Sequence, residues 1–211
     1  PSWEILIETE VNREGEILAD AILATGVQTG RCIKPFAVNA IRKLIEVDNV
    51  IAIIGELCSG ASLATSPIAK EAGIVMISPA STSSDLTNAG DHFFRTVPSD
   101  ALQGAEAAKL VEGLGYKSLA VLYVNDDYGV GFNKVLKENF DNVVISESFE
   151  KESTDLRTQL TKIKDKNPEA LYIISNSPSA AGAALKQSKE LGIQVQIFGS
   201  EGLKDDSVLE V

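Results

Sequence analysis

Apolar and polar residues follow two alternating periods along this chain. Short runs rich in β-branched and aromatic residues are each followed by a longer stretch with apolar residues at helical spacing. Strand, helix and strand return at about 25-residue spacing, which is typical of βαβ units and therefore of parallel sheets. The predicted strands are residues 4–7, 50–54, 74–77, 93–96, 119–124, 143–149, 170–175 and 194–198, and the predicted helices are 35–46, 61–71, 100–113, 129–139, 155–166 and 179–191, with 14–25 a further candidate.

Polar residues at the expected helix ends support this division. Asp100, with Gln103 three positions later, has the spacing of an N-cap and its capping-box partner. Ser153 and Thr154 can cap the helix predicted at 155–166. In the helix at 179–191, alanines and leucines face one way, and we expect the opposite side, which includes Gln187, to remain in water.

The strands predicted at 50–54 and 170–174 are apolar on both faces, which is typical of strands enclosed between two layers of helices. The apolar fraction of 44% is enough for a sizeable core and too high for a disordered chain. No apolar run approaches the roughly 18 residues of a membrane span, so we expect no membrane insertion by this chain.

The charge balance excludes one class of partner. The chain has 19 Lys and Arg against 30 Asp and Glu, a net charge of −11. A nucleic-acid groove needs clustered basic residues, and a basic membrane-binding face needs the same. We therefore expect neither nucleic acid nor an anionic membrane surface as a partner.

Few residues are available for catalysis or metal binding. Cys32, Cys58 and His92 lack zinc-ligand spacing, and no CxxC, GxSxG, P-loop or GxGxxG motif occurs. His92 is the single imidazole and lies at a loop-to-strand junction, where a surface or structural role is favoured over a catalytic one. The sequence therefore predicts no metal and no cofactor, and an enzyme is the least favoured class.

The loops that follow the predicted strands carry the candidate binding residues. Ligands of open parallel sheets bind beyond the carboxyl ends of the strands. Ser59 opens a helix whose amides and dipole suit an anion, and Ser81 and Thr82 add further donors. Glu201 could hold a cation, and Tyr128 could form an aromatic wall, so these groups together describe an α-amino acid site. The alternative is that the hydroxyls serve turns and caps and that Glu201 is a solvated surface acid.

The same loops resemble a known family. In order along the chain, the matching segments are AVNAIRKLIEVDNVIAIIGELCSGAS, GIVMISPASTSSDLT, FFRTVPSDALQGAEAAKLV, LYVNDDYGVG, TQLTKIKDKNPEALYII, KQSKELGI and FGSEGL. From about residue 31 onward they resemble the leucine/isoleucine/valine-binding proteins, the periplasmic receptors of branched-chain amino-acid ABC transporters. Members of that family are considerably longer, and the return of the chain to the first lobe after the Glu201 loop has no counterpart here, so we expect the match to be partial.

The resemblance implies an α/β fold of two three-layer α/β/α lobes with parallel sheets, and an amino acid or small amide held between them. The lobes would comprise residues 1–97 and 98–211, with the crossover near Val97 and Pro98. No cofactor is implied. The expected partners are the solute and an ABC permease, and the expected location is periplasmic or otherwise extracytoplasmic, with anchoring to the cell surface as a variant.

The site residues implied by the resemblance divide between the two lobes. Ser59, Ser81 and Thr82 would bind the ligand carboxylate, partly through backbone groups. Tyr128 and Glu201 would come from the second lobe, with Glu201 pairing with the ammonium group. At the side-chain end of the site the resemblance places Asn176.

The family also carries a disulfide at positions that match Cys32 and Cys58, where the alternative is two buried free thiols. Such a bond would close a loop of about 26 residues, stabilise the fold by roughly 3 kcal/mol and indicate an oxidising compartment. The main alternative function is a ligand-sensing regulatory or receptor module with the same fold, in which binding drives signalling instead of transport.

Overall fold

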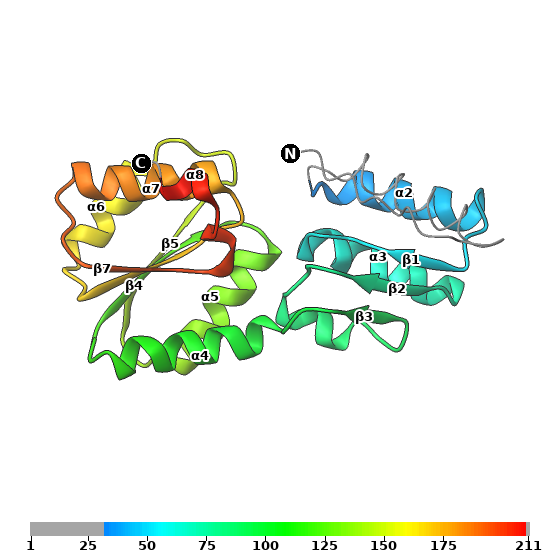
Figure 1. Cartoon of the computed structure of the whole chain (residues 1–211), viewed down its shortest axis with the longest axis horizontal. Coiled ribbons are helices and arrows are strands. Elements are labelled where there is room, and N and C mark those ends of the chain that lie inside the picture. Colours follow the sequence, from blue (N-terminus) through cyan, green and yellow to red (C-terminus); the bar gives the residue numbers. More distant parts are fainter. Residues whose placement is uncertain (1–31, 210–211) are drawn as a thin grey trace. The chain divides into compact units, whose positions relative to one another are not determined.

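The computed structural model describes residues 32–209, which belong to two compact units (Figure 1). Unit 1 comprises residues 1–98 and unit 2 comprises residues 99–211. The strand predicted at 4–7 and the candidate helix at 14–25 lie outside the described residues. Each unit is built on its own parallel sheet, as the spacing of strands and helices predicts.

Unit 1 contains a three-stranded parallel sheet in the order β1-β2-β3. Its two long helices pack against each other, and Ile41, Leu44 and Ala69 join Ile53 and Met76 in one core. The elements are α2 (Lys34–Glu46), β1 (Ala52–Ile54), α3 (Ser59–Ala72), β2 (Val75–Ser78), η1 (Ser84–Asn88) and β3 (Phe93–Arg95).

The first strand of unit 1 departs from the expectation of burial on both faces. Ile53 is buried, but Ile51 just before β1 is 62% exposed. The apolar run at 50–54 therefore predicts the strand itself and overstates its enclosure.

Unit 2 is a three-layer sandwich around a four-stranded parallel sheet in the order β5-β4-β6-β7. In Figure 1, α4 and α5 cover one face of this sheet, and α6, α7 and α8 cover the other. The elements are α4 (Asp100–Gly113), β4 (Leu119–Val124), α5 (Asp127–Asn139), β5 (Val143–Phe149), α6 (Arg157–Asp165), β6 (Ala170–Ile174), α7 (Pro178–Glu190), β7 (Gln196–Gly199), η2 (Glu201–Leu203) and α8 (Asp206–Leu209).

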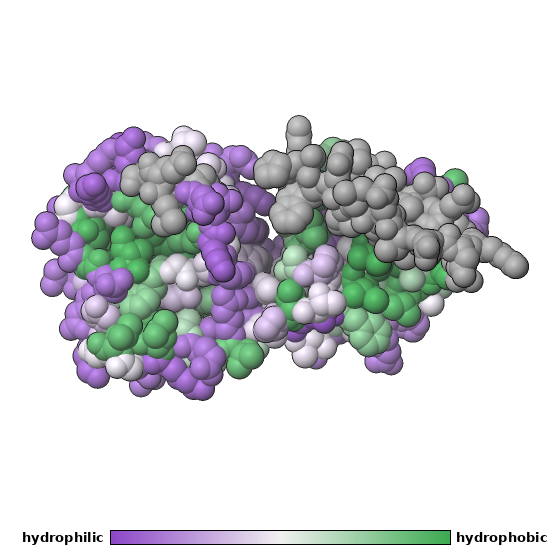
Figure 2. Space-filling view, in the orientation of Figure 1, coloured by the Kyte–Doolittle hydropathy of each residue, from purple (hydrophilic) through white to green (hydrophobic). Residues whose placement is uncertain are grey.

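The centre of the unit 2 sheet consists of aliphatic residues and tyrosines. Every residue of β6 is buried, as its apolar sequence on both faces predicts, and β6 pairs with both β4 and β7. In the described residues β7 pairs with β6 alone, and Figure 2 shows apolar surface beside this edge strand, where Ile197 and Phe198 are half-buried.

The helix that opens unit 2 begins differently from the prediction. Ser99, not Asp100, is the N-cap of α4, and its side chain accepts a hydrogen bond from the backbone N–H of Ala101. Asp100 is therefore the first helical residue and is buried. The predicted capping-box role of Gln103 is also wrong, because Asp100 is not the N-cap and the Gln103 side chain bonds to Glu201 instead.

The start of α6 is also stabilised by a residue that the sequence pattern places elsewhere. Neither Ser153 nor Thr154 caps this helix through its side chain, and Leu156 is the N-cap. Gln187 of α7, expected in water, is 5% exposed, and its Oε1 accepts the Leu156 N–H at 2.7 Å. Its Nε2 donates to the Thr154 carbonyl at 2.8 Å, so one amide joins α7 to the beginning of α6.

Within residues 32–209, no helix is both long and apolar enough to cross a membrane.

Candidate functional site

A disulfide anchors the loop before α3 in unit 1. Cys58 is the N-cap residue of α3, and Cys32 lies two residues before α2. The two form a disulfide with their Cα atoms 5.6 Å apart, which confirms the pairing implied by the resemblance. The bond ties the start of α2 to the start of α3, where the Ser59 loop lies.

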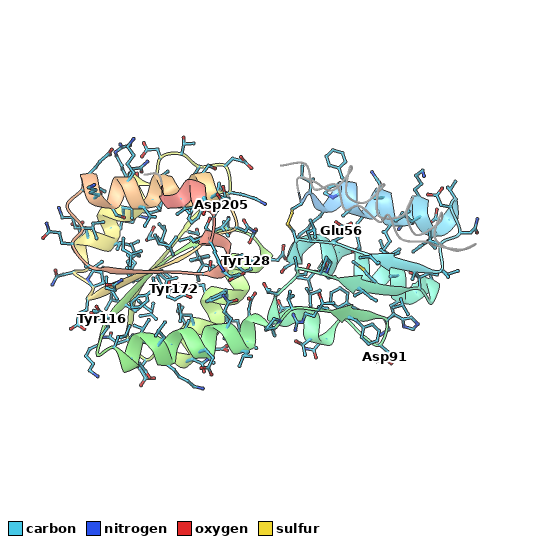
Figure 3. All side chains as sticks on the ribbon, in the orientation of Figure 1. Glu56, Asp91, Tyr116, Tyr128, Tyr172 and Asp205 are labelled. Carbon is cyan, nitrogen blue, oxygen red and sulfur yellow. A yellow bond between two sulfur atoms is a disulfide. The ribbon has the colours of Figure 1, made fainter. Side chains whose placement is uncertain are left out.

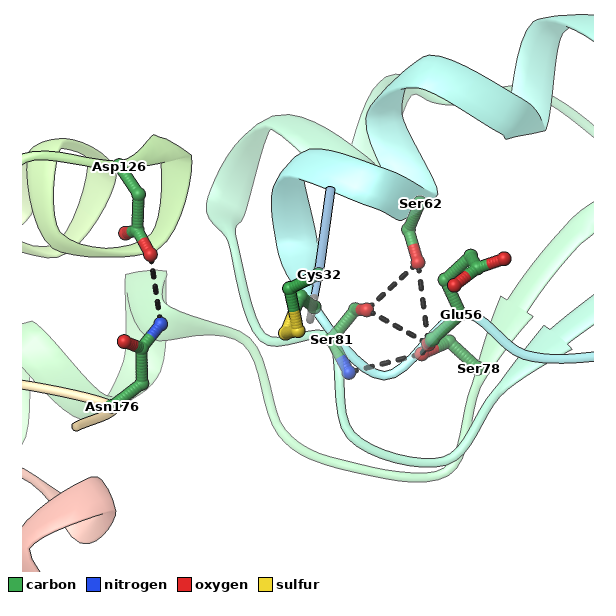
Figure 4. Close-up of a disulfide and its surroundings, with 8 residues drawn as sticks. Cys32, Glu56, Ser62, Ser78, Ser81, Asp126 and Asn176 are labelled. Atoms are coloured by element: carbon green, nitrogen blue, oxygen red, sulfur yellow. Dashed lines mark hydrogen bonds between the residues drawn. A yellow bond between two sulfur atoms is a disulfide. The ribbon is translucent and has the colours of Figure 1, made fainter. Parts of the chain in front are cut away.

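Buried serine hydroxyls hold two loops of unit 1 together (Figure 4). The backbone carbonyl of Glu56 accepts hydrogen bonds from the hydroxyls of Ser78 and Ser81, the latter at 3.1 Å. Ser81 also bonds to the hydroxyl of Ser62 at 2.8 Å. The loop that follows β1 is therefore fixed to the loop that follows β2, as expected for two strand ends at one edge of a parallel sheet.

The two predicted serines of unit 1 are part of this internal structure. Ser59 is 3% exposed, and its Oγ accepts the backbone N–H of Ser83 at 3.1 Å. Ser81 is fully buried. Thr82 is half-buried, and its carbonyl accepts a hydrogen bond from Arg95 at 3.0 Å. In this structure the Ser59 and Ser81 hydroxyls organise the loops.

The first turn of α3 offers a different kind of donor. This helix is 14 residues long, and its N-cap residue makes no side-chain hydrogen bond to the first turn. The first N–H groups of a helix have no intrahelical acceptor, and together with the helix dipole they favour a bound anion. The chemistry of this end of α3 therefore suits a carboxylate.

Three strand-end loops of unit 2 meet at one edge of its sheet. After β4, Asp126 caps α5, and its Oδ1 accepts the N–H of Gly129 at 2.9 Å. Its Oδ2 accepts a hydrogen bond from Nδ2 of Asn176, in the loop after β6, at 2.8 Å. In the loop after β7, a Cβ on Gly202 would lie 2.1 Å from the carbonyl oxygen of Ser175. These loops therefore lie in direct contact, and the third carries Glu201.

Glu201 is an exposed carboxylate held by a neighbour from another element. Its Oε2 accepts a hydrogen bond from Nε2 of Gln103, which lies in the first turns of α4. Gln103 is neutral, so it orients the carboxylate without cancelling its charge. The structure thus brings Glu201 together with a residue almost a hundred positions earlier in the chain.

The buried phenol of Tyr128 lies close to this carboxylate. Tyr128 is 5% exposed, and its hydroxyl is near Ser200 and Glu201 without a hydrogen bond of normal geometry to either. Burial, followed by the charge of Glu201, raises the pKa of Tyr128 well above its ordinary value. The group is therefore a neutral hydroxyl that can donate or accept one more hydrogen bond.

Tyr128 is the first ring in a series of aromatic contacts that runs through the core of unit 2. Tyr128 meets Phe132 edge to face with ring centres 6.1 Å apart, and Phe132 packs on Tyr172 at 5.8 Å. Tyr172 in turn stacks on Phe198 of β7. Tyr128 and Tyr172, both labelled in Figure 3, belong to the same buried core cluster of unit 2. The ring of Tyr128, predicted as an aromatic wall of the site, is thus mainly part of the core, and its hydroxyl lies at the end of the series nearest Ser200 and Glu201.

Sequence reasoning missed two residues of this cluster, Gln103 and Asp126. The position of Gln103 three residues after Asp100 predicts a capping-box role, and nothing in the local sequence indicates its contact with Glu201. Asp126 follows a strand and precedes a helix, which is a recognisable cap position, but its second contact depends on the parallel alignment of β4 with β6.

His92 has no catalytic partner in the part of the chain that the structure describes. It is half-buried, its Nδ1 has no hydrogen-bond partner among the described residues, and its carbonyl accepts the Met76 N–H as part of the unit 1 sheet. Among residues 32–209, no group of three or more His, Cys, Asp or Glu side chains could hold a metal ion.

Comparison with known proteins identifies the family. Residues 8–210 match the family described as the receptor family ligand binding region. The chain belongs to this receptor family. The Leu/Ile/Val/Thr-binding protein of Salmonella typhimurium is 29% identical over 208 residues, which is 96% of this chain and 56% of that protein. An amino acid binding protein of Pseudomonas aeruginosa is 27% identical over 94% of this chain and 54% of its own length. This receptor-family chain thus spans about half the length of these curated relatives.

Solved structures show the same fold. A leucine-binding protein from Thermotoga maritima superposes with a TM-score of 0.80 at 31% identity, over 85% of this chain and 53% of that one. A branched-chain amino-acid substrate-binding protein from Streptococcus pneumoniae, solved with isoleucine, gives 0.73 at 28% identity, over 92% and 60%. The α/β fold of this receptor-family chain is therefore that of the type I periplasmic binding proteins, as the resemblance implies.

Proposed function

We propose that this protein is an extracytoplasmic solute-binding receptor that captures an amino acid for delivery to an ABC permease. The observation that carries the proposal is the exposed carboxylate of Glu201, oriented by Gln103 beside the buried hydroxyl of Tyr128. Its relatives support the class of solute, since they include a Leu/Ile/Val/Thr-binding protein and a receptor solved with isoleucine. The Cys32–Cys58 disulfide is typical of proteins in oxidising compartments.

Each unit by itself carries a group that suits one charge of an amino-acid zwitterion. In unit 1 the amino-terminal turn of α3 suits the α-carboxylate, and Thr82 directly follows Ser81 of the serine network. The hydroxyls of Ser59 and Ser81 are already bonded within the unit, so these residues would act by shaping the loop and through backbone groups. In unit 2 the Glu201 carboxylate suits the α-ammonium, with Tyr128 and Asn176 beside it.

Replacing Glu201 by Gln tests the proposal, because it keeps the shape of the side chain and removes its charge. The proposal requires the bound ammonium to leave water beside Glu201, and loss of its charged partner then costs about 2–5 kcal/mol, so affinity for the preferred amino acid should fall by at least about thirtyfold. The measurement is titration calorimetry on the intact protein, after a thermal-shift screen of the twenty amino acids and simple amides.

Glu112→Gln is the matched control, because Glu112 is an exposed acid of the same helix that carries Gln103. We expect its affinity to equal that of the wild type. An affinity of Glu201→Gln unchanged within threefold would mean that Glu201 is a solvated loop acid and that the ammonium is bound elsewhere.

A further inference from the structure

The hydrogen bond between Asp126 and Asn176 orients a half-buried amide in unit 2 (Figure 4). A carboxylate can only accept hydrogen bonds, so the amide of Asn176 must direct its NH2 group toward Asp126. The Oδ1 atom of Asn176 therefore points away from Asp126. The direction is fixed further because the other oxygen of Asp126 accepts the Gly129 N–H and so holds the carboxylate in place.

This Oδ1 atom is buried and has no hydrogen-bond partner among the described residues. A buried acceptor without a donor is rare in folded proteins and is destabilising. The same cluster contains the buried hydroxyl of Tyr128, which also lacks a well-formed hydrogen bond. Gly202, next to Glu201, packs directly on Ser175 and Asn176, so the unpartnered oxygen lies beside the loop that carries the proposed ammonium-binding residue.

We infer that Asn176, oriented by Asp126, is a specificity-determining residue that selects an amino acid bearing a hydrogen-bond donor over an aliphatic one of the same shape. This inference rests on the proposed function and adds the class of solute to it. A hydroxyl or amide N–H on the solute supplies the missing donor to Oδ1. An aliphatic solute would leave the oxygen buried without a partner, which is the situation in which polar sites discriminate most strongly.

Isosteric pairs of amino acids provide the probes. Threonine and valine have nearly the same shape and differ by a hydroxyl in place of a methyl group, and asparagine and leucine differ by a carboxamide in place of an isopropyl group. By calorimetry on the intact protein, we expect the donor-bearing member of at least one pair to bind at least about tenfold more tightly than its aliphatic partner. Equal binding, or a preference for the aliphatic member in both pairs, overturns the inference while leaving the proposed function in place.

Two substitutions test the assigned roles. Asn176→Leu removes the acceptor, so the preference should disappear or reverse toward the aliphatic solutes. Asp126→Asn retains a side chain that can cap α5 but can donate as well as accept, which frees the Asn176 amide to turn around. We expect this variant to lose most of the preference, and a preference equal to that of the wild type would overturn the orienting role of Asp126.

Asn125→Leu is the matched control. Asn125 also donates its side-chain amide to a carboxylate, Glu150 at 2.8 Å, but that pair is exposed at the surface. Its preference should match that of the wild type, and loss of preference in this variant as well would overturn the specific role of Asn176. The wild-type comparison decides the inference even where a variant fails to fold. Binding of none of the four probes overturns the inference, whereas binding of none of the twenty amino acids and simple amides overturns the proposed function as well, so the two failures are distinguishable.

Discussion

The amide of Gln187 should contribute measurably to the stability of unit 2. It bonds to the backbone on both sides of Asp155, accepting from Leu156 and donating to Thr154. Gln187→Met keeps the length of the side chain and removes both polar atoms. Leu156 is fully buried, so its N–H would lose its partner at a cost of about 1–3 kcal/mol. Thr154 is exposed, so its carbonyl can turn to water at little cost.

The lost hydrogen bond should therefore lower the free energy of unfolding by about 1–3 kcal/mol, and the greater apolarity of Met should offset up to about 1 kcal/mol of this loss. Urea unfolding followed by circular dichroism measures this loss, and hydrogen exchange at the Leu156 amide reports the lost bond directly. Gln196→Met is the control, since Gln196 is exposed and its side chain bonds, among the described residues, to the adjacent Ile197 carbonyl alone. The stability of this variant should stay within about 0.5 kcal/mol of the wild type. A Gln187 variant as stable and as slow to exchange as the wild type would refute the role given to this amide.

Two further predictions concern a strand-end loop and the core of unit 2. Gly202→Ala should lower the free energy of unfolding by about 1–3 kcal/mol and weaken amino-acid binding, because its Cβ would lie 2.1 Å from the Ser175 carbonyl oxygen. Gly113→Ala is the control, since a Cβ there meets nothing within 4 Å, and it should leave both quantities unchanged in unfolding and binding assays. Burial, followed by the charge of Glu201, raises the pKa of Tyr172 to about 12, so its contribution to stability should be complete below pH 10 and disappear between about pH 10 and 12. Ultraviolet titration of the folded protein checks this, with Tyr172→Phe as the control, and ionisation of all four tyrosines near pH 10 would contradict it.

The sequence predicts the elements best where several signals agree. The bounds of β4, β5 and α4 match those of the predicted segments, because each has an uninterrupted pattern and clear flanking residues. The capping residue is harder to predict even where the bounds match, because Ser99 and Asp100 are both good caps in sequence and only the geometry chooses between them. The role of Gln187 could not be predicted, because its partners lie more than thirty residues away and are brought near only by the packing of α6 on α7.

The candidate site shows the same division between local and long-range information. The rule that ligands bind at the carboxyl ends of parallel strands predicts which loops meet within each unit, and the structure places them together. It does not predict which atoms of those loops remain available. Hydroxyls that look like ligand donors in the sequence, those of Ser59 and Ser81, are bonded inside unit 1.

This difference between the units has a consequence for solute specificity. In unit 1 the buried hydroxyls of Ser59, Ser78 and Ser81 all have partners, so changing any of them alters the loop itself. In unit 2 the Tyr128 hydroxyl and the Oδ1 atom of Asn176 lack well-formed partners, whereas Nδ2 of Asn176 bonds to Asp126 and helps to hold the loops. The Asp126–Gly129 hydrogen bond and the close contact of Gly202 fix these loops further. A polar atom can determine selectivity without changing the fold only where no hydrogen bond within the loop depends on that atom. Differences in solute preference among proteins with this arrangement should therefore arise at the positions of Tyr128 and Asn176 more than in the serine network.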